Sequence, residues 1–330
     1  MSTKRTLPFA GVIGLLGMLA AAPAHAYCRT SNTTTPTFEG HVCTPSHKDD
    51  SGLPLFWGMP RITYSVQMDA SKDVPFDTAR LAVRTAFDAW TSADCEGQPP
   101  RLELIEGAPA LCALDEYNKD RGNANIIFFV DEGWSDDTSK LAITTVTFDV
   151  NSGEIYDADM ALNTTDWPFT TDGAPDGIDL LSVLTHEAGH FVGLSHSPDP
   201  EATMTAHYHP PEQLDLSSLA EDDRAGICAM YPPGPIADGC DATPRHGFSS
   251  LCAEDQSGPV LDAPPTGERC CCLEGDVCVD GVCVEAPGGC ACTTSPAPLG
   301  PGVVALHLAA LVASLLRRRA TGGRRAPAPA

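Results

Sequence analysis

An eleven-residue stretch, from His186 to His196, reads HExxHxxGxxH and constrains the fold more than any other feature of the sequence. Residues four apart lie about 40° apart around a helix axis, so His186 and His190 would project from one face. Glu187 would lie beside them, close enough to reach a water on a metal without being a ligand. Gly193 can adopt the positive φ that ends a helix, after which the chain can turn and bring in His196. Three nitrogen ligands with an open fourth position are typical of a catalytic zinc site.

The residues before the motif predict that it lies on a buried helix. Apolar side chains recur at helical spacing over residues 180–192, and Asp179 or Asp176 is a suitable N-cap. The alternative is a set of three ordinary core histidines. It is unfavourable, because three buried imidazoles without a metal would leave polar nitrogens in need of partners.

The sequence after the motif resembles the metzincin metallopeptidases and, within them, the matrixins. Met204 follows His196 by eight residues, inside the sequence DPEATM, as in the methionine turn of the metzincins. Segment 219–231 resembles the last matrixin helix, and segments 62–66 and 79–90 resemble the first strand and first long helix. The resemblance covers roughly residues 56–233. It gives Met204 a structural role as a packed floor below the zinc, not as a ligand.

The resemblance implies an α+β fold of the metzincin zincin type. We expect a twisted mixed sheet, three main helices and a zinc cleft between an upper and a lower subdomain. The apolar run 125–130 suits a buried strand, and the segments 141–150 and 155–162 suit two strands joined by a turn. By resemblance, residues 141–146 would form the edge strand above the cleft and pair with an extended substrate backbone. The sequence alone also allows a paired internal strand there.

The resemblance further implies a zinc metalloendopeptidase that acts on protein or peptide substrates. His186, His190 and His196 would hold Zn²⁺, and Glu187 would take a proton from water and pass it to the leaving amine. Segment 205–216 would wall the primary specificity pocket. One alternative is a surface-displayed adhesion or binding protein on the same scaffold with little turnover, which the intact Glu187 argues against. A second is a zinc hydrolase with a non-peptide substrate, which the methionine turn disfavours.

The beginning of the chain predicts export. Lys4 and Arg5 precede an apolar run over residues 7–22, and the sequence AHA over residues 24–26 follows. A basic start, a short hydrophobic region and an A-x-A site are typical of a signal peptide, here cleaved after Ala26.

The end of the chain resembles the C-terminal sorting signal of myxobacteria. Cys290 and Cys292 precede an apolar stretch over residues 299–316 and three arginines at 317–319. We therefore expect a hydrophobic helix that associates transiently with the membrane, with an amphipathic terminal helix as the alternative. The two ends together predict an exported protein, at the cell surface or outside a Gram-negative bacterium.

The charge of the chain argues against nucleic acid and anionic membrane surfaces as partners. The chain has 20 Lys and Arg against 44 Asp and Glu; two basic residues lie in the predicted leader and five in the tail. The part between them is therefore strongly acidic, and we expect it to be monomeric.

Matrixins generally bind calcium, so the resemblance makes structural Ca²⁺ a second candidate cofactor. Its candidate ligands, each explained equally well as a solvating charge, are Asp131, Asp136, Asp137, Asp157 and Asp159. The second, structural zinc of vertebrate matrixins is not expected, because no histidine lies between His47 and His186.

Fourteen cysteines in an exported chain predict disulfides. Cys28 with Cys43 and Cys95 with Cys112 are candidate local pairs. Eight further cysteines, from Cys228 to Cys283, lie in or just before a Gly- and Pro-rich region that we expect to form a small stapled module. For the cysteines from Cys270 to Cys283, a metal cluster is the less favoured alternative. The predicted organisation is a signal peptide (1–26), an N-terminal segment (27–55), a matrixin-like catalytic domain (56–233), a Cys-rich disulfide module (234–288) and a sorting tail (289–330).

Overall fold

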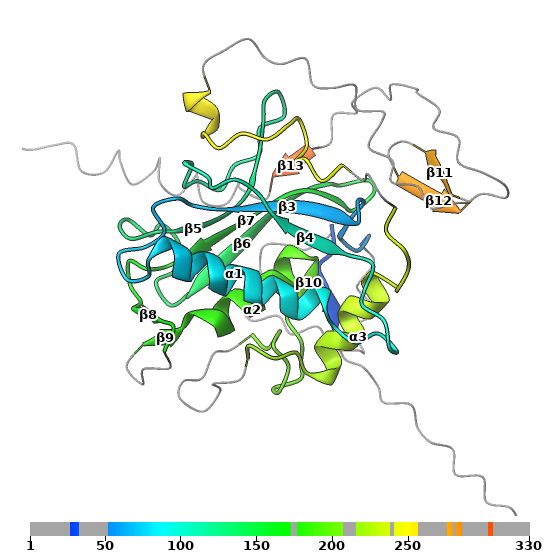
Figure 1. The fold of residues 1–330 in the computed structure, drawn as a ribbon, viewed down its shortest axis with the longest axis horizontal. Helices are drawn as coiled ribbons and strands as arrows, with labels where there is room; N and C mark the ends of the chain where they lie inside the picture. Colours follow the sequence, from blue (N-terminus) through cyan, green and yellow to red (C-terminus); the bar gives the residue numbers. More distant parts are fainter. Residues whose placement is uncertain are drawn as a thin grey trace, which may run out of the picture.

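The computed structural model describes residues 27–32, 52–172, 177–206, 216–237 and 241–256, and the backbone of 276–279, 282–285 and 303–305. The predicted leader, most of the predicted tail and much of the predicted Cys-rich module lie outside these residues. Figure 1 shows the central sheet with helices α1 (Phe76–Thr91) and α2 (Leu180–Phe191) packed beside it, and α3 (Glu221–Met230) near one end of α2.

The sheet is mixed, as the resemblance to the metzincins implies. Its strands run in the order β13-β6-β7-β5-β3-β4, and β2 also pairs with β7. Neighbouring strands among β3, β4, β5 and β7 are parallel, β2 is parallel to β7, and β6 runs antiparallel to β7. The bounds are β2 (Phe56–Trp57), β3 (Arg61–Val66), β4 (Glu103–Glu106), β5 (Asn125–Phe129), β6 (Ala142–Asp149), β7 (Glu154–Leu162) and β13 (Val303–Ala305).

Short strand pairs join the loops around the sheet. β1 (Cys28–Arg29) pairs with β10 (Leu194–Ser195), and β8 (Phe169–Thr170) pairs with β9 (Ile178–Asp179) just before α2. β11 (Asp276–Val279) and β12 (Val282–Glu285) form a separate hairpin, and one 3₁₀ turn covers Ala253–Asp255.

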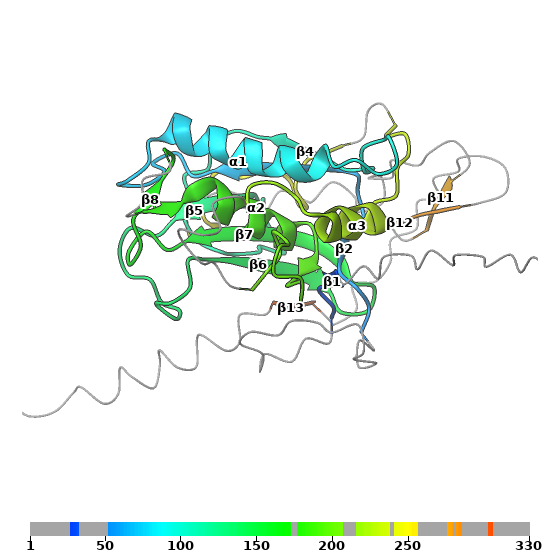
Figure 2. The ribbon, with the colours of Figure 1, turned by 90° about the horizontal axis from the view of Figure 1, so that it is seen from below.

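Alternation along the strands divides the apolar side chains between two faces. Tyr64 on β3 and Phe129 on β5 belong to the main core, which also contains Phe87 of α1 and Phe191 of α2. The Phe87 ring lies 4.5 Å from that of Tyr64 and 5.0 Å from that of Phe191. Ile126 and its neighbours on the opposite face of β5 pack in a smaller cluster. Figure 2 shows α1 and α2 layered against the sheet, so the motif helix is enclosed between α1 and strands β6 and β7.

The predicted pairing of Cys95 with Cys112 is wrong. Cys95, just after α1, is bonded to Cys228 in α3, and Cys112 is bonded to Cys252. The fold brings cysteines together across separations of 133 and 140 residues, whereas spacing in the sequence favours near neighbours. Cys28 is also disulfide-bonded, and Cys43 lies outside the described residues. Cys228 and Cys252 therefore join α3 and the segment after it to residues near the sheet, rather than staple a separate module.

The described part of the chain contains no helix with the length and apolar character needed to cross a membrane. In the predicted tail, only Val303–Ala305 is described, and it is extended where the sequence led us to expect a helix. These residues pair with Thr147–Asp149 of β6. The difference has a simple cause, because two β-branched valines meet a strand edge that supplies hydrogen-bond partners.

Candidate metal centre

Local signals fix the two ends of α2, which carries the first part of the motif. Asp179 is the N-cap, and its side chain accepts a hydrogen bond from the backbone N–H of Ser182 at 2.8 Å. The alternative N-cap, Asp176, lies outside the described residues. The helix ends at Phe191, and Gly193 has a φ of +103°, as the sequence predicts. A Cβ at Gly193 would lie 2.9 Å from the carbonyl oxygen of Leu55, so glycine also allows a close backbone approach.

The three histidines of the motif converge on one point. Their ligand nitrogens all lie within 4.8 Å of one another. The Nε2 atoms of His190 and His196 are 3.2 Å apart. Two nitrogens bound to one tetrahedral zinc, each roughly 2.0–2.1 Å from it, would be about 3.3 Å apart. The spacing therefore fits two ligands of a single zinc ion.

Backbone carbonyls fix the ring orientation of two of these histidines. The Nδ1–H group of His186 donates to Thr203 O at 2.7 Å, and that of His190 donates to Leu194 O at 2.9 Å. With the proton on Nδ1, each Nε2 presents its lone pair. Burial, followed by the effect of His190, lowers the pKa of His186 to about 4, so its ring is neutral at neutral pH. This is the form in which imidazole binds a metal.

Met204 packs directly against α2 between the first two histidines. Its side chain is 2% exposed, and its Sδ lies 2.2 Å from where a Cβ of Gly189 would be. Glycine at this helix position therefore makes room for the methionine. The backbone also ties this turn to the third histidine, because Ser197 N–H donates to Met204 O at 2.7 Å.

Two buried carboxylates from the start of α3 hold the methionine turn. Asp223 accepts hydrogen bonds from the backbone N–H groups of Thr203 at 2.7 Å and Met204 at 3.1 Å. Asp222 accepts from the Ser197 hydroxyl at 2.6 Å. Burial raises the pKa of Asp223 above its usual value. Nothing in the sequence singles out these residues, because acidic groups at a helix start look like ordinary surface charges.

Glu187 is 6% exposed and lies on α2 beside His186. The hydroxyl of Thr144 in β6 donates to its Oε2 at 2.6 Å. The sequence pattern did not single out Thr144, which lies 43 residues before Glu187 and is joined to it only by the fold.

Aromatic side chains donate hydrogen bonds to backbone oxygens within α2 and at its C-terminal end. Trp90 of α1 donates through Nε1 to Thr185 O at 2.8 Å, and Trp57 donates in the same way to Phe191 O at 2.8 Å. Tyr231 donates through its hydroxyl to Val192 O at 2.8 Å. The last two bonds satisfy carbonyls that a helix end leaves without partners, which stabilises the end of α2 next to the third histidine.

The N-terminal segment reaches the same loop from outside the motif. Through β1, Cys28 and Arg29 pair with Ser195 and Leu194. The hydroxyl of Thr30 donates to Leu194 O at 2.9 Å, and this is the carbonyl that also accepts from His190 Nδ1. The loop between the second and third histidines therefore accepts hydrogen bonds both from the N-terminal segment and from the motif helix.

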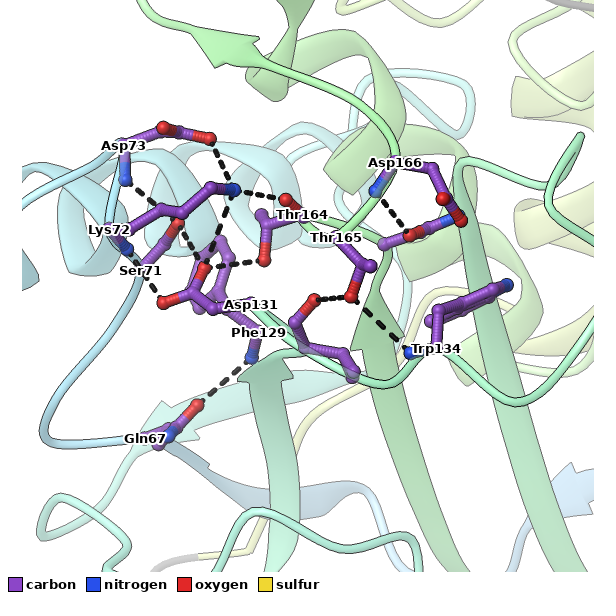
Figure 3. A network of polar contacts seen from close by, with 12 residues as sticks. Gln67, Ser71, Lys72, Asp73, Phe129, Asp131, Trp134, Thr164, Thr165 and Asp166 are labelled. Carbon is purple, nitrogen blue, oxygen red and sulfur yellow. Dashed lines mark hydrogen bonds and ion pairs between the residues drawn. The ribbon is translucent and has the colours of Figure 1, made fainter. Parts of the chain in front are cut away.

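Figure 3 shows Asp131 within a polar network that joins the loops after β3, β5 and β7. Asp131 accepts hydrogen bonds from Ser71 Oγ at 3.1 Å, the Lys72 backbone N–H at 2.8 Å and Thr164 Oγ1 at 2.7 Å. The Lys72 ammonium group lies 3.9 Å from Asp131 and also donates to Thr164 O. Protein donors thus occupy both Asp131 oxygens, and the nearby positive charge is that of a lysine.

The carboxylates predicted as calcium ligands do not form a group of three within the described ranges, and calcium stays a prediction. Asp136 pairs with Lys140 at 3.0 Å, and Asp137 accepts from Ser139 N–H at 2.8 Å. Asp157 and Asp159 are buried on β7. No three carboxylates of the described residues bring oxygens within 4.8 Å of one another. Cys112, Glu116 and Cys252 do come that close, but the two cysteines are joined to each other and present no thiolate.

The predicted pocket wall is only partly described, because residues 207–215 lie outside the structure's described ranges.

Comparison with known proteins points to one family. Residues 56–232 match the family model described as Matrixin. Matrix metalloproteinase-16 of Homo sapiens is 30% identical over 188 residues, which cover 54% of this chain and 27% of that protein. Matrilysin of Rattus norvegicus is 43% identical over 63 residues, which cover 19% of this chain and 23% of that protein. The matches therefore span about a quarter of the length of these relatives.

Proposed function

The chain belongs to the matrixin family, and from this membership we propose that it is a zinc-dependent endopeptidase that hydrolyses protein or peptide substrates. The observation that carries the proposal is the arrangement of the three histidines. Their nitrogens lie within 4.8 Å of one another, and two of the rings are held by backbone carbonyls with Nε2 directed to the shared point. Such a donor set, with one position left open, fits a catalytic zinc ion.

We assign each side chain of the site one role. His186, His190 and His196 hold the zinc, and Met204 packs below them without binding it. When bound, zinc polarises the scissile carbonyl and lowers the pKa of the attacking water. Glu187 removes a proton from that water as it attacks, and then gives the proton to the nitrogen of the leaving amine as the peptide bond breaks.

The substrate would bind along β6 as an added strand. Within the described ranges, residues 142–146 pair with β7 on one side, and β13 reaches only Thr147–Asp149 on the other. The free backbone groups of residues 142–146 lie on the strand that passes next to Glu187, as the bond from Thr144 requires. An extended peptide paired there would be held by main-chain hydrogen bonds with its scissile bond near the metal.

The proposed setting is outside the bacterial inner membrane. The disulfides Cys95–Cys228 and Cys112–Cys252 support an oxidising compartment. The leader (1–26) and the sorting tail (289–330) of a Gram-negative surface protein stay predictions from the sequence. We propose a monomer whose tail contacts the membrane transiently.

The test is hydrolysis of casein and of a quenched fluorescent peptide library by the full chain. We expect cleavage that a chelator abolishes and added zinc restores. Glu187→Ala should retain zinc and lower kcat/KM by about 10²- to 10⁴-fold, because general acid–base catalysis contributes that much. Glu132→Ala is the matched control, since Glu132 is exposed and lies outside the metal centre.

Two results would contradict the proposed function. One is a zinc-loaded parent chain that cleaves neither casein nor any library peptide, which is the behaviour expected of an adhesion protein on this scaffold. The other is a zinc-retaining Glu187→Ala variant that cleaves as fast as the parent.

A further inference from the structure

Thr144 faces α2 because of its place in the alternation of β6. It lies directly opposite Met160 of β7, and Val146 follows two residues later on the same face. Met160 and Val146 both belong to the core that α2 covers. Thr145, the next residue, points to the other face and donates to Asp115 at 3.2 Å. The register of the strand therefore directs one threonine hydroxyl to the metal centre and its neighbour away from it.

The Thr144 hydroxyl reaches two oxygens of Glu187 but can donate to only one at a time. Its Oγ1 lies 2.6 Å from Glu187 Oε2 and 3.3 Å from the backbone oxygen of the same residue. A hydroxyl carries a single hydrogen. The shorter contact is to the carboxylate, and a charged acceptor makes the stronger hydrogen bond. The side-chain carboxylate is therefore its main partner.

Glu187 depends on this hydrogen bond more than Thr144 does. Thr144 is partly exposed, so water could satisfy its hydroxyl. Glu187 is buried, and among the described residues Thr144 supplies the one side-chain hydrogen bond to its carboxylate. A glutamate has several rotatable bonds, and fixing them costs conformational entropy each time the side chain must find its working orientation. The bond from β6 removes this freedom before a substrate arrives.

We propose that Thr144 is a positioning residue for the general base. It holds Glu187 through Oε2, so that Oε1 is left to accept the proton from the attacking water and to return it to the leaving amine. The inference rests on the proposed function of Glu187. It adds that the strand expected to bind the substrate also orients the base, so that peptide binding and proton transfer share one element.

The test compares the full zinc-loaded chain with three variants on a single fluorescent peptide. Thr144→Val keeps the shape of the side chain but removes the hydroxyl, and Thr144→Ser keeps the hydroxyl. Thr85→Val makes the same change on the exposed face of α1, outside the metal centre and the substrate strand, where the Thr85 hydroxyl donates to Leu81 O at 2.8 Å. Zinc content and the melting temperature are measured for each protein.

We expect Thr144→Val to lower kcat by about 10- to 100-fold, the range for loss of a hydrogen bond to a charged group, with KM unchanged and zinc retained. Thr144→Ser should recover most of the rate, and Thr85→Val should behave as the parent. A positioning role is excluded if Thr144→Val keeps the parent kcat, if its loss lies in KM, if serine does not rescue it, or if Thr85→Val is equally slow.

A second readout does not depend on turnover. Crystal structures of the parent and of Thr144→Val should show one Glu187 rotamer in the parent, with Oε2 bonded to Thr144, and more than one in the variant. A single unchanged rotamer in both would overturn the inference. If the parent does not cleave peptides, the proposed function fails, and the crystal structures still decide the role of Thr144.

Discussion

Gly189→Ala is expected to destabilise the protein, although alanine is the better helix former. Helix propensity alone would favour the variant by about 1 kcal/mol. In the folded chain, however, the new Cβ would lie 2.2 Å from Met204 Sδ and 2.8 Å from Trp90 Cζ2. Met204 is flexible but fully enclosed, and the Trp90 ring is held by its bond to Thr185 O. Overpacking a core typically costs about 1–3 kcal/mol, and two such close contacts place this site at the upper end. The net loss of unfolding free energy is therefore about 1–2 kcal/mol.

Urea unfolding measures this loss, first with a chelator present and then with zinc. The variant should unfold at lower urea in both conditions, and its zinc affinity should also fall, because Met204 must move beneath the histidines. Gly234→Ala is the control, since its Cβ would meet only ordinary contacts, the nearest being Arg101 Cδ at 3.4 Å. A Gly189→Ala variant as stable as the parent, or more stable, would show that the packing beneath the metal centre is looser than described.

Two further predictions concern the sheet and its braces. Burial, and then the charge of Asp157, raise the pKa of Asp159 well above its usual value, so this group stabilises the fold at low pH and loses that contribution as pH rises from about 3.9 through its folded pKa. The unfolding free energy of the parent minus that of Asp159→Asn should therefore fall with rising pH, and a difference that grew would contradict the shift. Replacing Cys112 and Cys252 together by alanine should lower the unfolding free energy by about 2–5 kcal/mol, and peptide mapping without reductant should recover this pair; a fragment that joins Cys95 to Cys112 would refute the pairing.

The parts of the fold that the sequence predicted are those whose causes are local. The N-cap at Asp179 and the positive φ at Gly193 follow from the chemistry of single residues. The buried strand was expected at 125–130 and spans Asn125–Phe129, because a short apolar run needs no distant partner to be recognised. The mixed sheet and the three helices were expected from the resemblance of the chain to the matrixins, which rests on the zinc motif and on segments 62–66, 79–90 and 219–231.

The parts that the sequence did not predict depend on contacts between distant residues. Asp223 stabilises the methionine turn from α3, and nothing near it in the sequence distinguishes it from a surface acid. Thr144 looked like one more β-branched residue of a strand, since only the register of β6 against β7 turns it toward Glu187. The Cys112–Cys252 bond has the same origin, because it joins residues that are close only after the sheet has formed.

The metal centre draws support from residues on both sides of the family match at 56–232. Before it, Thr30 bonds to Leu194 O through its hydroxyl and to Gly193 O through its backbone N–H, at 2.9 Å each. A chain that began at the predicted domain boundary would leave the loop to the third histidine without these donors. After the match, Cys252 is bonded to Cys112. The guanidinium group of Arg245 lies 3.6 Å from the ring centre of Tyr156, which is on β7, the strand that pairs with β6. The boundaries at 56 and 233 stay predictions, but these bonds show that Thr30 contacts the loop to the third histidine and that Arg245 and Cys252 contact the sheet and the loop before β5.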